Sequence, residues 1–132
     1  MPIPDFQTIM LPLLELLNDG NERSIQEINS SLASYFNLTV QEVNILLSSG
    51  TQTVFYNRVC WARIYLSKSG LIELVRKACY KITDQGKSTL QEKPERIDVK
   101  FLKKYPEFLE FIKRDKKSDK ENKIEKKKKW KK

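Results

Sequence analysis

The sequence contains no histidine and only two cysteines. Cys60 and Cys79 lie 19 positions apart and neither belongs to a CxxC pair, so we expect no zinc site and no disulfide framework. A glycine-rich phosphate loop is also missing, and no carboxylate cluster is expected at strand ends. The residue types therefore predict a protein without metal or cofactor.

Long apolar runs are missing as well. No segment approaches the roughly 20 apolar residues of a membrane span, and the first residues are acidic and contain proline where a signal peptide would be basic. We therefore expect no membrane contact and a cytoplasmic location. Only 4 glycines and 5 prolines accompany 39% hydrophobic residues, which excludes a collagen-like or wholly disordered chain. The 132 residues suffice for one ordinary domain with an appendage.

The charge is distributed unevenly along the chain. Residues 113–132 hold 12 Lys/Arg and 4 Asp/Glu, which accounts for the whole net charge of +8. The remaining residues are neutral in sum, yet residues 1–57 carry 1 basic and 6 acidic side chains, against 12 and 7 in residues 58–112. An acidic first half and a basic second half can orient a protein on a polyanion. A chance distribution of charged residues explains the difference equally well. The lysine-rich tail is predicted to be disordered and to add affinity independent of sequence.

Helical periodicity dominates the first half. Helices are predicted over residues 5–18, with a kink at Pro12, over 24–37, over 39–47 and over 51–69. Capping boxes of the form Ser/Thr-x-x-Glu open the second and third of these. In the fourth helix, one buried stripe is expected to consist of Phe55, Val59, Ala62 and Leu66.

Two short β-rich runs follow at residues 71–75 and 78–82, with Arg76 and Lys77 between them. They predict a hairpin with a basic tip. A helix capped by Thr83 is expected to reach about residue 93, and one or two docking helices, broken near Pro106, are expected over 98–112.

This order of elements is that of a winged helix-turn-helix, so the predicted fold class is mainly α with a small β-hairpin and a disordered basic C-terminal tail. We assign residues 1–93 to the winged-helix domain, 94–112 to a helical extension or linker, and 113–132 to the tail. The helix over residues 51–69 would be the recognition helix, because a helix fits the major groove and a basic wing can touch the backbone. The predicted DNA-binding residues are Thr51, Gln52, Thr53, Asn57, Arg58, Trp61, Arg63, Lys68, Arg76 and Lys77.

Several of these residues have structural alternatives. For Trp61 and Tyr65, packing against the first helix is more expected than contact with bases, because aromatic residues on a helix of a small domain more often belong to the core. Arg58 lies near the edge of the buried stripe, where a salt bridge or cap is as well supported as a phosphate contact.

A series of short motifs resembles the N-terminal domain of Mrr restriction proteins, the type IV restriction endonucleases. The resemblance covers about residues 1–112, and its motifs occur in the family's order. They are Met1-Pro-Ile-Pro-Asp, Leu11-Pro12-Leu13-Leu14, Asp19-Gly20, Ser49-Gly50, Val54-Phe55, Asn57-Arg58-Val59, Trp61-Ala62, Tyr65-Leu66, Gly70-Leu71, Ile82-Thr83, Gly86 and the run from Pro94 to Leu102.

This resemblance implies a winged-helix module that recognises methylated or otherwise foreign double-stranded DNA ahead of a nuclease domain. The nuclease domain itself is expected to be absent, so we predict no catalysis by this chain, which would be a free-standing recognition subunit or a truncated restriction protein. Glu121-Asn122-Lys123 has the letters of a nuclease motif but lies in a lysine tract. A homodimer and a separately encoded nuclease subunit are the possible protein partners, and a winged-helix protein-interaction domain is the alternative function.

Overall fold

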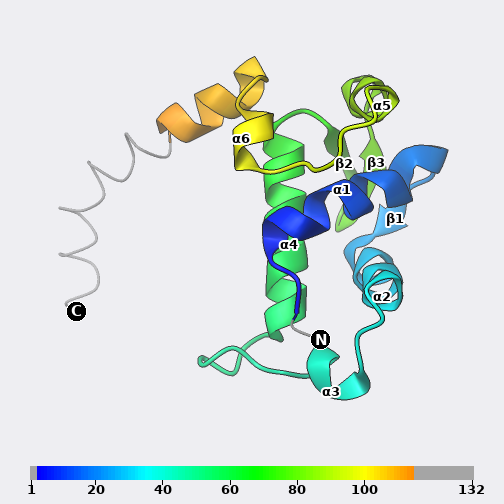
Figure 1. Cartoon of the computed structure of the whole chain (residues 1–132), viewed down its shortest axis with the longest axis vertical. Helices are drawn as coiled ribbons and strands as arrows, with labels where there is room; N and C mark the ends of the chain where they lie inside the picture. Colours follow the sequence, from blue (N-terminus) through cyan, green and yellow to red (C-terminus); the bar gives the residue numbers. More distant parts are fainter. Residues whose placement is uncertain (1–2, 115–132) are drawn as a thin grey trace, which may run out of the picture.

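The computed structural model describes residues 3–114; the lysine-rich tail, together with Glu121-Asn122-Lys123, lies outside the described residues apart from its first two positions. Among the described residues, no helix has both the length and the apolar character that a bilayer crossing requires. The elements in chain order are α1 (Phe6–Leu16), η1 (Leu17–Asp19), β1 (Arg23–Ser24), α2 (Ile25–Tyr35), α3 (Val40–Val43), α4 (Val54–Lys68), β2 (Ile72–Arg76), β3 (Cys79–Ile82), α5 (Asp84–Gln91) and α6 (Val99–Leu102) (Figure 1). A further helix covers residues 106–114.

The helix starts follow the predicted caps. Ser24 and Thr39 each form a complete capping box, in which the hydroxyl accepts from the backbone of Glu27 or Glu42 and that glutamate accepts from the capping residue's N–H. These reciprocal bonds satisfy two amides that a helix start otherwise leaves open. Pro12 lies inside α1, and α3 ends at Val43, four residues before its predicted end.

Helix α4 passes through the middle of the fold (Figure 1). Its predicted stripe of Phe55, Val59, Ala62 and Leu66 is fully buried, which confirms the periodicity. The predicted start at residue 51 is wrong by three residues, because the side chain of Thr53 caps the helix and accepts from the backbone N–H of Tyr56. Residues 44–53 instead form a closed loop, in which Leu47 and Gln52 are joined by a backbone hydrogen bond of 2.9 Å.

The predicted hairpin is present, but it belongs to a three-stranded antiparallel sheet in the order β1-β3-β2. Strand β1 was not predicted, because two residues are too few for a periodic signal. It pairs Arg23 with Tyr80 and Ser24 with Cys79. The hairpin turn is formed by Lys77 and Ala78, so Arg76 is the last residue of β2 and not part of the turn.

The segment after α5 folds back on the helical core. Ile97 and Leu102 are fully buried, and Phe108 is 1% exposed. All three belong to the same hydrophobic core as the residues of α1 and α4, and the hydroxyl of Tyr105 is hydrogen-bonded to that of Thr89 in α5. The break predicted near Pro106 lies between α6 and the helix over 106–114.

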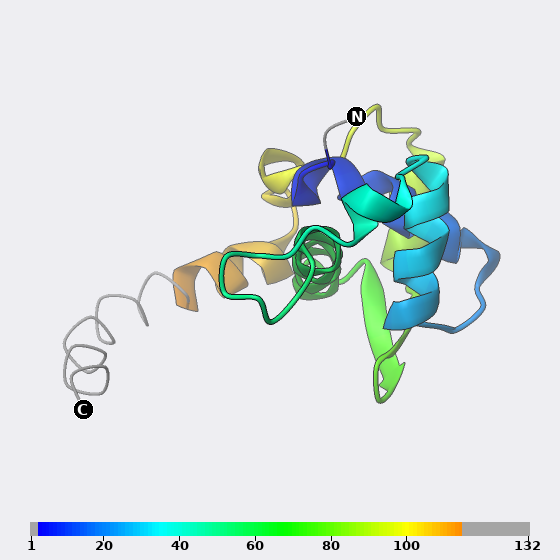
Figure 2. The ribbon, with the colours of Figure 1, turned by 90° about the horizontal axis from the view of Figure 1, so that it is seen from below.

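Mainly helical structure with a small sheet is therefore confirmed. Viewed along α4, the helix over 106–114 lies on one side of it and the β2–β3 hairpin on another, while α1 and α2 lie on the remaining side (Figure 2).

Candidate nucleic-acid interface

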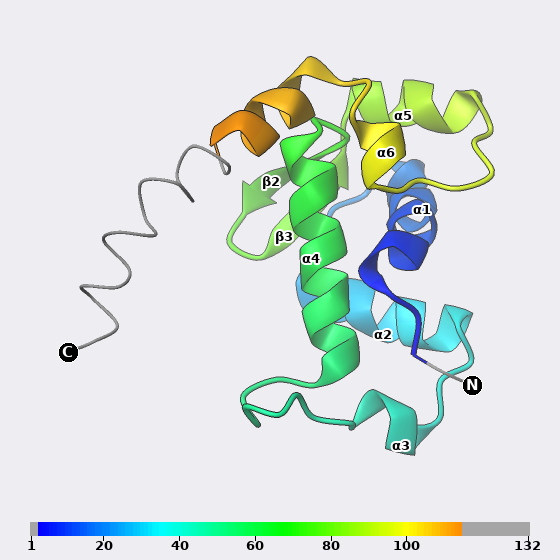
Figure 3. The same cartoon turned by 60° about the vertical axis from the view of Figure 1, so that its left-hand side comes forward.

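One face of α4, here called the uncovered face, lies against no other helix or strand of residues 3–114, and its side chains are half-buried or exposed. In Figure 3 the helix stands in front, with the hairpin to its left, the 44–53 loop below and the 106–114 helix above. Because Phe55, Val59 and Leu66 point into the core, helical geometry turns Asn57, Ile64 and Lys68 to the opposite side. The uncovered face thus contains Asn57 and Lys68, two of the predicted DNA-binding residues.

The residues before α4 form side-chain hydrogen bonds around its N-terminal end. Thr51 is exposed, and its hydroxyl is 2.9 Å from that of Ser49. The side chain of Gln52 accepts a hydrogen bond of 3.0 Å from the amide of Asn57. Both amides keep further donor and acceptor capacity, so the pair can present a fixed hydrogen-bonding edge to a ligand.

Arg58 is turned away from this face. Its guanidinium donates to the backbone oxygen of Ile3 at 2.8 Å and to that of Pro4 at 3.3 Å. The structure therefore places Arg58 as a tie between α4 and the segment before α1, in line with the structural alternative that the sequence left open.

Arg63 is directed toward the hairpin. Its guanidinium donates to the hydroxyl of Tyr80 at 2.7 Å and to the backbone oxygen of Cys60 at 3.3 Å. Tyr56 completes this cluster: burial, and then its hydrogen bond with the Cys60 thiol, raise the pKa of the tyrosine hydroxyl. Arg63 thus joins α4 to β3, and its guanidinium lies 5.4 Å from the centre of the Tyr80 ring.

Trp61 contradicts the expectation that it packs in the core. Its side chain is 46% exposed and contacts the edge of Tyr65 at a ring separation of 6.2 Å. Tyr65 is the residue that packs inward, against Phe6 at 5.0 Å. Lys68 is exposed beside them, with its ammonium 5.7 Å from the centre of the Phe111 ring.

The hairpin tip carries the remaining candidates. The side chain of Arg76 is 70% exposed and pairs with Glu22 at 2.7 Å. Such an exposed pair contributes about 0–1 kcal/mol, so Arg76 can exchange this partner for another anion at little cost. Lys77 is exposed in the turn next to it.

The predicted residues are therefore not one cluster. Thr51, Gln52, Thr53, Asn57, Trp61 and Lys68 lie along α4 and its approach, and Arg76 and Lys77 lie on the hairpin beside it. Arg58 and Arg63 diverge to opposite sides of the helix, which corrects the expectation from the sequence that both cluster on one side with Asn57, Arg76 and Lys77. Sequence reasoning missed the partners of Arg63 and Arg76, because both come from distant parts of the chain. Arg63 donates to Tyr80 on β3, and Arg76 pairs with Glu22, the residue before the unpredicted strand β1.

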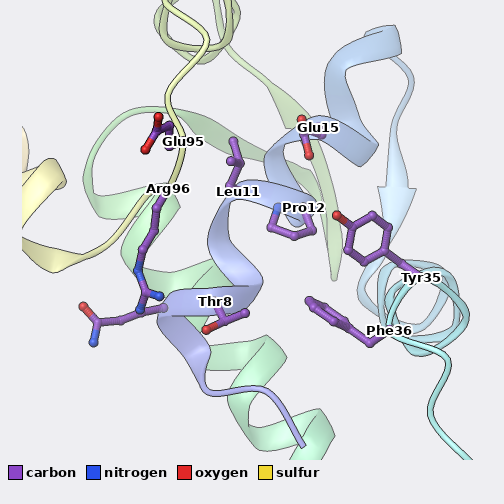
Figure 4. Close-up of a pocket in the computed structure, with 9 residues that line it drawn as sticks. Thr8, Leu11, Pro12, Glu15, Tyr35, Phe36, Glu95 and Arg96 are labelled. Atoms are coloured by element: carbon purple, nitrogen blue, oxygen red, sulfur yellow. The ribbon is translucent and has the colours of Figure 1, made fainter. Parts of the chain in front are cut away.

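A separate pocket of about 260 Å³ lies between α1, the end of α2 and residues 95–96 (Figure 4). Leu11 and Pro12 line it from the side of α1 opposite its buried residues, and Tyr35 and Phe36 face them. The pocket contains none of the predicted site residues. Within residues 3–114, no group of three or more Cys, Asp or Glu side chains is placed to hold a metal ion.

Comparison with known protein families identifies one match. The Mrr N-terminal domain matches residues 6–92, about two thirds of the chain, from the first residue of α1 to one residue beyond α5. Comparisons with curated proteins and with solved structures give no match. The matched range contains the whole of α4, the three strands and every predicted contact residue. The chain therefore belongs to the Mrr N-terminal domain family.

Proposed function

We propose that this protein is a DNA-recognition domain of an Mrr-type restriction system, with a winged-helix fold in which α4 is the recognition helix and the β2–β3 hairpin is the wing. The proposal rests on one observation above all. A 15-residue helix is buried along one stripe and uncovered on the opposite face, and that face lies beside a hairpin whose tip carries Arg76 and Lys77. A helix of this kind fits the major groove, and a basic wing fits the phosphate backbone.

The role of each group follows from its chemistry. The Asn57 amide, oriented by Gln52, is suited to the hydrogen-bonding edge of adenine. Arg76 and Lys77 supply sequence-independent phosphate contacts that position the helix. Methylated or otherwise foreign duplex DNA is the proposed ligand, in keeping with the family. We also propose that recognition and not hydrolysis is the task of this chain.

The test is fluorescence anisotropy of the full chain on unmodified, cytosine-methylated and adenine-methylated duplexes over a salt series. Asn57→Ala should reduce the preference among duplexes by about 1–3 kcal/mol, and Arg76→Ala with Lys77→Ala should weaken binding to all of them equally. Ser88→Ala, at an exposed position on α5, is the control. Binding that none of these variants changes would refute the assignment of α4 and the hairpin. Incubation with plasmid and Mg²⁺ tests the proposed lack of hydrolysis.

A protein-interaction domain is the second candidate, and a specific observation favours it. Trp61 is 46% exposed, and on β2 Leu74 is 58% and Val75 39% exposed. Exposed apolar side chains of this size are typical of surfaces that contact other proteins. A homodimer in solution that Leu74→Lys dissociates, together with failure to bind duplex DNA, would support this candidate over the first.

A further inference from the structure

The uncovered face of α4 has one structural element on each side of it, and we call these two elements its flanks. Both flanks carry basic residues at their outer ends. One flank is the β2–β3 hairpin, which Arg63 joins to α4 through the Tyr80 hydroxyl at 2.7 Å. The other is the helix over residues 106–114, which packs through Phe111 against Tyr65 at a ring separation of 6.0 Å. Figures 1 and 2 both place α4 between these two elements.

Positive charge near the uncovered face comes mainly from the flanks. Arg58 and Arg63 of α4 are both engaged in internal hydrogen bonds, which leaves Lys68 as the exposed cation of the helix. On the hairpin flank, Arg76 and Lys77 are exposed, as are Lys113 and Arg114 on the other flank. Acidic side chains accompany them, since Glu73 on β2 and Glu107 and Glu110 on the 106–114 helix are exposed too.

The side of the molecule formed by α1, α2 and α3 is unsuited to a polyanion. Residues 1–43 contain 6 acidic residues and one basic residue, Arg23, whose guanidinium is paired with Asp19 at 2.7 Å. A duplex that approached over α1 to α3 would meet an excess of carboxylates and be repelled. A duplex that approached the uncovered face of α4 would meet cations on both sides.

We propose that Lys113 and Arg114 form a second phosphate-binding flank, so that DNA is held from both sides of α4: the hairpin tip contacts one backbone strand, and the end of the 106–114 helix contacts the other. This inference rests on the proposed function and deepens it. It assigns a DNA-binding role to a segment beyond residues 6–92, the range that the Mrr N-terminal domain matches.

The experiment must count only binding that covers α4, because the lysine-rich tail can bind DNA by itself. The chain has two tryptophans, Trp61 and Trp130. In the full-length Trp130→Phe protein, Trp61 is the only tryptophan, and its emission responds when the uncovered face of α4 is occupied. A 20-base-pair duplex is titrated against this signal at several salt concentrations, and the slope of log Kd against log salt counts the phosphate contacts at about 0.9 per contact.

Four double variants are compared in this background. Lys113→Gln with Arg114→Gln, and Arg76→Gln with Lys77→Gln, should each lower the slope by about 1 to 2. Two pairs serve as charge-matched controls. One is Lys131→Gln with Lys132→Gln in the tail. The other is Lys100→Gln on α6 with Lys103→Gln directly after it, and α6 lies on the other side of α4 (Figure 3). Each control should lower the slope by less than about 0.5.

The outcomes separate the two proposals. If the hairpin pair lowers the slope but Lys113→Gln with Arg114→Gln does no more than the controls, the second flank is wrong and the proposed function stands. If duplex DNA leaves the Trp61 emission unchanged while anisotropy still reports binding, the tail alone binds DNA, and both the second flank and the proposed recognition helix are wrong.

Discussion

Replacing Phe108 by alanine tests whether the C-terminal extension is a structural part of the domain. Phe108 is 1% exposed and lies 5.7 Å from the Tyr65 ring and 6.0 Å from the Phe111 ring. Truncation of a buried phenylalanine to alanine lowers the free energy of unfolding by about 3–5 kcal/mol, because the transfer free energy of the ring is lost and a cavity is left in the core. The 94–114 segment can relieve part of this cost by local detachment, so we expect a loss of about 3 kcal/mol in the free energy of unfolding.

Urea unfolding of the full chain, followed by far-ultraviolet circular dichroism, measures this loss. Leu109→Ala is the matched control: it is the next residue of the same helix but is 45% exposed, so its loss should stay below about 1 kcal/mol. A lower m-value in the Phe108→Ala protein would report that the segment has detached before global unfolding. If Phe108→Ala costs no more than Leu109→Ala, the extension does not contribute to the core and the reasoning fails.

Three further predictions concern local features of the fold. Gly86→Ala should lower the Tm by about 10 °C, because the added Cβ would lie 2.2 Å from the backbone oxygen of Leu71. This clash should outweigh the better helix propensity of alanine, and a raised Tm in a thermal scan would contradict the prediction. Ser24→Ala removes one half of a capping box and should cost about 1 kcal/mol in urea unfolding, whereas Ser30→Ala, exposed on the same helix, should cost less than half of that. The hydrogen bond from the Thr8 N–H lowers the pKa of the Asp5 carboxyl below its usual 3.8, so the charged carboxylate stabilises the fold above pH 3.8 and this stabilisation is lost as the pH falls through the lowered pKa. Asp5→Asn should therefore lower the free energy of unfolding by about 0.3–1 kcal/mol at pH 7. If the two proteins still differ by this amount at pH 2, the cause is not electrostatic.

Sequence reasoning reached most of the local structure because the signals were local. The boxes at Ser24 and Thr39 and the stripe along α4 depend on residues three or four positions apart, and the structure has them as predicted. Strand β1 was beyond this reasoning, since its two residues form a strand only through their pairing with Tyr80 and Cys79, far away in the chain. The start of α4 was placed too early because Thr51 and Thr53 are both acceptable caps and tertiary contacts of the loop decide between them.

The candidate site was predicted in outline and not in detail. Helical geometry places Asn57 and Lys68 on the uncovered face without knowledge of the fold. Long side chains are harder to place, because several rotamers reach different partners and the chosen partner comes from a distant element. Arg58 reaches the backbone at Ile3 and Pro4, and Arg63 reaches Tyr80, so two of the strongest candidates by residue type serve first as internal ties.

The pairing of β1 with β3 also shapes the time course of folding. Helices α2, α3 and α4 lie between the two strands in the chain, and their internal contacts are local and quick to form. The contact between Arg23 and Tyr80 must instead wait until the chain closes a long loop, whose entropy is lost before any pairing is gained. Once it is closed, the start of α2 is held by the hydrogen bond from Ile25 N–H to the backbone oxygen of Ala78 at the hairpin turn. We therefore expect the start of α2 to become fixed only when β1 has paired with β3, later than the contacts within each helix.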